Sequence, residues 1–208
     1  MPHLFRSLFQ RLHVARRRVR YSALIVIGIL LFGCSPTLNW REVRFESMDG
    51  SNTLIALLPC KPDSATRQQD VGGENVDLSM MGCETGGVTY TLARINLANP
   101  VLATKILAAW QAATLANVRA PQPVPQPHGA LPAQAISIRG ASVWPPATQM
   151  TVQGQSRHVQ VAWFAKQNPT GVVLYQAALY APLPGSEPGS MSALHAAAST
   201  FFESLHLP

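Results

Sequence analysis

The first 41 residues contain no acidic side chain, although six arginines lie within the first twenty. A run of thirteen uncharged residues, Tyr21–Gly33, follows these arginines. A helix needs about 20 apolar residues to cross a bilayer, so this run is short for a transmembrane span. A cationic segment followed by a short apolar core is typical of a secretory signal peptide. We therefore expect residues 1–33 to be a signal that is removed on export.

The signal has no small-residue cleavage site of the Ala-x-Ala kind in front of Cys34. Instead, the run Leu31-Phe32-Gly33-Cys34 resembles the lipobox of bacterial lipoproteins, with a bulkier residue than usual at Phe32. The resemblance implies cleavage before Cys34, lipid on its thiol and amine, and a short lipidated tether at residues 34–39. Ser35 resembles the pattern of lipoproteins sent to the outer membrane. The alternative is an uncleaved signal anchor in which Cys34 is an ordinary thiol.

Beyond the signal, the chain has almost no net charge. Without the six arginines, ten basic and ten acidic residues remain, so the pI near 9.7 is a property of the signal. A nucleic-acid binder needs a basic patch, and we therefore expect no nucleic-acid partner. Eight of the ten acids lie between Glu42 and Glu84. This asymmetry could orient a partner, but we prefer the interpretation that these are solvated faces of separate strands.

Cysteine is scarce, and Cys60 and Cys83 are the two that remain when Cys34 carries lipid. An exported domain lies in an oxidising compartment, which favours a structural disulfide between them. The bridge would close a loop of about 24 residues and stabilise the fold by roughly 3 kcal/mol. A redox-active pair is the alternative, but the C-x-x-C spacing is missing. A metal site would require further cysteine or histidine ligands nearby.

Residues 40–208 are long enough for one domain, in which strand-like segments form two groups. We expect strands at Trp40–Glu46, Leu54–Leu58, Asn75–Met81 and Gly87–Leu97, and again at Ala135–Arg139, Thr148–Gln153, Arg157–Lys166 and Gly171–Tyr180. The polar segment Ala65–Val71 is either an edge strand or a loop. As the central strand of a plain meander it would hold the two cysteines about 9–10 Å apart, beyond the roughly 7 Å limit for bridged Cα atoms. We therefore expect it not to be a central strand.

Two helices complete the pattern. Asn99 is a good N-cap before Pro100, and Leu102, Ile106 and Trp110 recur every four residues in a helix that ends near Val118. A proline-rich spacer, residues 120–132, follows this helix, and a second helix with one apolar stripe extends from residue 191 to residue 205. The order predicts an α+β domain, an antiparallel sheet with two main helices packed on it.

Three segments together resemble the Mog1/PsbP-like group of envelope and organelle domains. They are Pro59-Cys60-Lys61-Pro62, the hairpin from Arg157–Lys166 to Gly171–Tyr180, and Phe201-Phe202-Glu203-Ser204-Leu205, in which Leu205 departs from the usual aromatic residue. The resemblance implies an α/β sandwich with an accessory, binding or assembly role. It offers no catalytic residues to carry over.

No phosphate loop, G-x-S-x-G elbow or H-E-x-x-H motif occurs in the sequence. The histidines after the signal, at positions 128, 158, 195 and 206, are scattered, and we expect no cofactor, metal or catalytic group. Trp144 lies in a loop, where it either marks a contact surface or packs over the end of the sheet. We expect a lipid-anchored, periplasm-facing binding or assembly module. The alternatives are a hydrolase or thiol enzyme, and a carrier that holds a small apolar ligand under the alanine-rich helix around Trp110.

Overall fold

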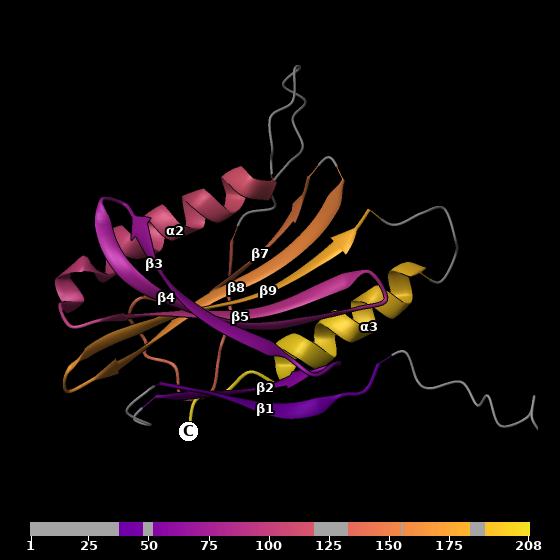
Figure 1. Cartoon of the computed structure of the whole chain (residues 1–208), viewed down its shortest axis with the longest axis horizontal. Coiled ribbons are helices and arrows are strands. Elements are labelled where there is room, and N and C mark those ends of the chain that lie inside the picture. Colours follow the sequence, from indigo (N-terminus) through magenta and orange to yellow (C-terminus); the bar gives the residue numbers. More distant parts are fainter. Residues whose placement is uncertain (1–37, 48–51, 119–132, 155, 184–189) are drawn as a thin grey trace, which may run out of the picture. The chain divides into compact units, whose positions relative to one another are not determined.

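The computed structural model describes residues 38–47, 52–118, 133–154, 156–183 and 190–208. The predicted signal peptide, Cys34 and the spacer 120–132 lie outside these residues, so the expectations for them remain predictions. The described residues form a two-stranded and a seven-stranded antiparallel sheet with two helices packed on them (Figure 1), which confirms the α+β class.

The small sheet pairs β1 (Arg41–Glu46) with β2 (Thr53–Leu58). The large sheet has the strand order β3-β4-β5-β9-β8-β7-β6. Its strands are β3 (Asp63–Val71), β4 (Glu74–Thr85), β5 (Val88–Leu97), β6 (Gln134–Ala135), β7 (Thr148–Gln153), β8 (Arg157–Asn168) and β9 (Gly171–Pro182). The helical elements are η1 (Pro100–Leu102), α2 (Ala103–Val118) and α3 (Ser190–Glu203).

The large sheet is covered on both faces. One core cluster joins α2, through Ile106 and Trp110, to β4, β5 and β9. The other core cluster joins the opposite face of the sheet to the β1–β2 hairpin and α3, through Phe45 and Phe201. In Figure 1, α2 accordingly lies on one side of the sheet, and α3 and the β1–β2 hairpin lie on the other. Because both faces are buried, β9 is an almost continuous apolar run rather than an alternating one.

The helix predicted between Pro100 and Val118 is confirmed, with its first turn as the 3-10 helix η1. The Asn99 side chain accepts a hydrogen bond from the Val101 N–H at 3.0 Å, as an N-cap does. The span Pro100–Val118 is apolar and long enough to cross a membrane by composition. Ile106 and Trp110 are buried against the sheet, so one face of this helix packs on the domain.

One strand prediction was largely wrong. A strand was predicted at Ala135–Arg139, but β6 covers only Gln134–Ala135, so only Ala135 of the predicted segment lies in a strand. Arg139 instead bridges His206 of the C-terminal tail, and its carbonyl accepts from the Leu207 N–H at 2.9 Å. The tail lies so close that a Cβ on Gly140 would overlap the Leu207 carbonyl. Arg139 therefore pairs with the tail, whereas the Ile136 N–H still donates to the Ala147 carbonyl at 3.0 Å, next to β7.

The disulfide is present and joins Cys60 to Cys83 with a Cα–Cα distance of 5.9 Å. The polar segment 65–71 is part of β3, the edge strand of the large sheet, while β2 belongs to the small sheet. Asp63 is directly opposite Gly82 in the β3–β4 register, which brings the two cysteines to the same end of this hairpin. The expectation that the polar segment is not a central strand is confirmed.

Between the sheet and the β1–β2 hairpin, two polar side chains are buried. The Arg94 guanidinium lies over the Phe45 ring, 4.7 Å from its centroid. Burial raises the pKa of Tyr175 to about 12, an effect that the Arg94 charge opposes. The Tyr175 hydroxyl makes no hydrogen bond within the described part of the chain.

Replacing Tyr175 with phenylalanine is expected to remove much of the loss of stability at alkaline pH. The pKa of Tyr175 is higher in the folded than in the unfolded chain, so its contribution is present below pH 10 and is lost as pH rises toward 12. The two-unit difference corresponds to roughly 3 kcal/mol once both states are ionised, and to about half of that at pH 11. Urea unfolding of both proteins at pH 8 and pH 11 measures this effect. Equal alkaline losses in both proteins would contradict it.

Candidate binding cavity beneath α2

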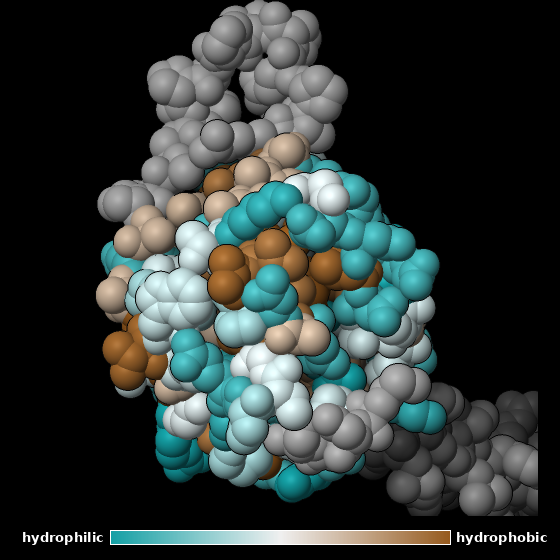
Figure 2. Space-filling view, turned by 90° about the vertical axis from the view of Figure 1, so that its left-hand side faces the viewer, coloured by the Kyte–Doolittle hydropathy of each residue, from teal (hydrophilic) through white to brown (hydrophobic). Residues whose placement is uncertain are grey.

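A cavity of about 250 Å³ lies between α2, the β3–β4 hairpin and the large sheet. We call it the α2 cavity. Its lining residues are Arg67, Gln69, Asp70, Val71, Gly72, Leu78, Met80, Ala93, Ala109, Trp110, Ala113, Thr114, Asn117, Gln176 and Tyr180. Figure 2 shows the end of the domain at the left of Figure 1, where an apolar area is bordered by hydrophilic side chains.

The inner wall of the α2 cavity is apolar except for two hydrogen-bonded polar side chains, Gln176 and Thr114, which we call the Gln176–Thr114 relay. Leu78, Ala93 and Trp110 are buried there. The Gln176 side-chain amide donates to the Thr114 hydroxyl at 2.9 Å, which in turn donates to the Trp110 carbonyl at 2.9 Å. Buried polar groups held in a fixed network are suited to orienting a ligand in an otherwise apolar site.

The rim of the α2 cavity is polar. Arg67, Asp70 and Asn117 are exposed, so opposite charges border the opening. Tyr180 on β9 adds an aromatic side chain, and burial raises its pKa while the nearby Arg157 charge opposes the shift. The cavity can therefore accept a compound that has both an apolar part and hydrogen-bonding groups.

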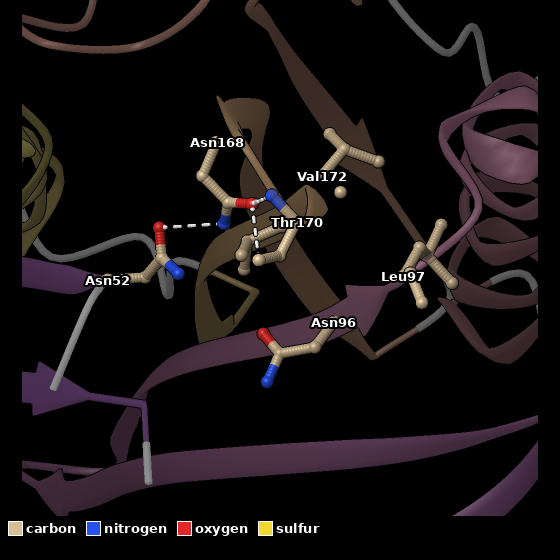
Figure 3. A pocket seen from close by; sticks show the side chains of 9 residues that line it. Asn52, Asn96, Leu97, Asn168, Thr170 and Val172 are labelled. Atoms are coloured by element: carbon tan, nitrogen blue, oxygen red, sulfur yellow. Dashed lines mark hydrogen bonds between the residues drawn. The ribbon is translucent and has the colours of Figure 1, made fainter. Parts of the chain in front are cut away.

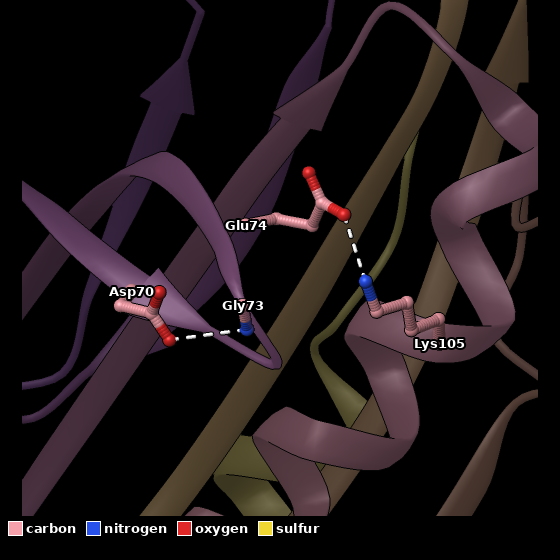
Figure 4. A network of polar contacts seen from close by, with 4 residues as sticks. All are labelled: Asp70, Gly73, Glu74 and Lys105. Atoms are coloured by element: carbon pink, nitrogen blue, oxygen red, sulfur yellow. Dashed lines mark hydrogen bonds and ion pairs between the residues drawn. The ribbon is translucent and has the colours of Figure 1, made fainter.

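The β3–β4 turn, which contributes Asp70 and Gly72 to the lining of the α2 cavity, is held to α2 by further contacts (Figure 4). Lys105 of α2 forms an ion pair with Glu74 at 2.7 Å. A Cβ on Gly72 would lie 2.8 Å from the Ala109 Cβ, so the turn backbone packs tightly on the helix. Gly72 also has a φ of 66°, which favours glycine. The Asp70 carboxylate accepts from the Gly73 N–H at 3.1 Å and fixes the turn.

A second cavity, of about 260 Å³, lies beside the β8–β9 turn and contains three asparagines (Figure 3). The Asn168 amide donates to the Asn52 side-chain oxygen at 3.3 Å. The Asn168 oxygen accepts from both the N–H and the hydroxyl of Thr170 at 2.9 Å. These bonds hold the turn in place, and Asn96 forms the opposite wall. We therefore interpret this cavity as part of the structure of the β8–β9 turn and not as a ligand-binding site.

Trp144, the residue predicted to be in a contact loop or packed over the sheet, is 46% exposed, and Val143 beside it is 94% exposed. The Trp144 carbonyl accepts from the Gln167 side chain at 3.2 Å. The loop therefore presents apolar surface, but it does not line the α2 cavity.

The described histidines do not line either cavity. His158 lies 3.3 Å from the Gln160 amide, and burial lowers its pKa. His206 contacts the Ser204 carbonyl at 2.9 Å within the tail. Within the described ranges, no group of three or more His, Cys, Asp or Glu side chains could hold a metal ion.

Sequence reasoning found only part of the α2 cavity. The alanine-rich surface around Trp110 permitted either a space under the helix or tight packing, and the polar segment that contains Arg67 and Asp70 was expected to be an edge strand or a loop. Gln176 lies in the apolar run of β9 and gave no signal of its own, although a lone amide within such a run indicates a buried polar contact.

No family model, curated protein or solved structure matches this chain. The site must therefore be interpreted from its own geometry, and the likeness to the Mog1/PsbP-like group remains a prediction.

Proposed function

We propose that the protein is a lipid-anchored, non-catalytic binding module of the bacterial envelope, which holds a small amphipathic ligand in the α2 cavity. The cavity itself carries the proposal, because an apolar wall with a fixed Gln176–Thr114 relay and a polar rim are the features of small-molecule sites. Its volume is slightly below the range of about 300–1,000 Å³ typical of drug-sized ligands. The ligand is therefore expected to be small.

The lipobox at Cys34 supports the anchor, and Ser35 favours the outer membrane. The disulfide between Cys60 and Cys83 suits an oxidising compartment such as the periplasm. A Mog1/PsbP-like sandwich, whose members mostly have accessory roles, fits this function. We favour it over an enzyme because the α2 cavity lining includes no histidine, cysteine or serine.

Filling the cavity tests its role. Ala112 and Ala113 are both exposed, but Ala113 lines the α2 cavity and Ala112 does not, so Ala113→Phe places a ring at the opening of the cavity and Ala112→Phe places the same ring elsewhere on α2. Both variants and the wild type are purified from membranes in detergent, and retained small molecules are extracted and identified by mass spectrometry. We expect one compound in near-stoichiometric amount with the wild type and Ala112→Phe, and at least about tenfold less with Ala113→Phe.

The intact mass of the same wild-type sample tests the anchor. A chain that begins at Cys34 and carries three acyl chains is expected, and a chain that begins at Met1 would refute the lipoprotein proposal. Equal retained compounds in all three proteins, or none in any of them, would refute ligand binding in the α2 cavity.

A further inference from the structure

β3 ends the large sheet as a long and exposed edge. It pairs with β4 from Asp63 to Val71 in a continuous register without a bulge. Residues 63–68 are all exposed. The strand contains neither proline nor lysine, two of the residues that natural proteins place on edge strands to prevent further pairing. The backbone of β3 is therefore able to accept another strand.

We propose that β3 pairs antiparallel with β3 of a second copy of this chain, across a twofold axis perpendicular to the sheet. Such an axis keeps the α2 layers of both copies on the same side of the joined sheet. Residues directly opposite each other point to the same face, and residues alternate between faces along a strand. Opposite residues must therefore both have odd or both have even numbers, which leaves few registers.

The charges of β3 select one of these registers. When Ala65 lies opposite Ala65 of the second copy, Asp63 lies opposite Arg67 at both ends of a five-residue overlap. A register centred on Arg67 would place two guanidinium groups opposite each other, which is unfavourable. Pro62 has no N–H to donate and ends the overlap at Asp63. A single twofold contact thus forms two opposite-charge pairs.

The direction of the twofold axis also suits membrane attachment. The described chain begins beside the β1–β2 hairpin, where the Asn39 N–H donates to the Pro59 carbonyl at 2.8 Å. The axis keeps this layer of both copies on one side of the joined sheet, so the first described residues of both copies lie on the same side. Two copies anchored in one membrane are confined to its surface, which raises the effective concentration of one copy around the other. This argument rests on the proposed function.

A cysteine at the twofold position tests the pairing. Opposite Cα atoms in an antiparallel pair lie about 4.5–5.5 Å apart, within the range of a disulfide. In detergent-extracted full-length protein treated with a mild copper oxidant, Ala65→Cys is expected to form a covalent dimer on a non-reducing gel. Gln68→Cys is the matched control, because it is equally exposed but lies three residues from the axis in each copy. Dimers from both variants, or from neither, would overturn the proposal.

A charge exchange tests the register in the Ala65→Cys background. Arg67→Glu places like charges opposite each other at two positions, and we expect about tenfold less covalent dimer. Adding Asp63→Arg restores opposite charges and is expected to restore the dimer. A double variant that stays monomeric would overturn the register. Ala113→Phe should leave the cross-link unchanged, which separates failure of this pairing from failure of ligand binding.

Discussion

Replacing Phe201 with alanine is expected to lower the free energy of unfolding by about 3–5 kcal/mol. Phe201 of α3 is completely buried, and its ring packs edge-on against Tyr90 of β5 with centroids 5.5 Å apart. Its removal leaves a cavity between the helix and the sheet, and the surrounding strands cannot move inward to fill it. Urea unfolding followed by circular dichroism measures the change.

The neighbouring Phe202→Ala is the matched control. Phe202 also contacts Phe201, with ring centroids 5.0 Å apart, but it is only partly buried. We expect this variant to lose about 1 kcal/mol. Equal losses for the two variants would contradict the larger contribution that complete burial predicts for Phe201.

Removing the disulfide is expected to destabilise the domain by roughly 3 kcal/mol. Cys60 and Cys83 are 23 residues apart in sequence, and without the bridge the unfolded chain between them gains conformational entropy. Cys60→Ser with Cys83→Ser should therefore unfold at a lower urea concentration than the wild type. A reducing agent should lower the wild-type midpoint toward that of the double variant and leave the double variant unchanged. A wild type that is indifferent to reductant would contradict a structural role for the bridge.

The alternation and length of the apolar segments predicted most of the strands and both helices. Asn99 and Pro100 marked the start of the first helix because capping is a local interaction. The disulfide also followed from counting cysteines, and its geometry correctly excluded a central position for residues 65–71.

Long-range interactions could not be predicted in this way. The separation of β1 and β2 into a second sheet depends on which face of the large sheet Phe45 and Leu54 cover, and their spacing along the chain does not encode this. Arg139 was expected in a strand of the sheet, but it pairs with His206, almost seventy residues later in the chain. The α2 cavity likewise depends on the curl of the β3–β4 hairpin toward Ala109, a contact between distant segments.

The C-terminal tail imposes an order on the folding of this domain. His206 exchanges backbone hydrogen bonds with Ile55 at 2.9 and 3.1 Å, and Leu207 bonds to Arg139, so the last residues of the chain complete the layer that contains the first strands. A contact of such large sequence separation forms slowly and cannot form before the final residues have been delivered. A chain emerging from a ribosome therefore cannot complete this layer before residues 206 and 207 have emerged. Truncation by only three residues would remove this closure, while both helices and every strand would remain intact in sequence.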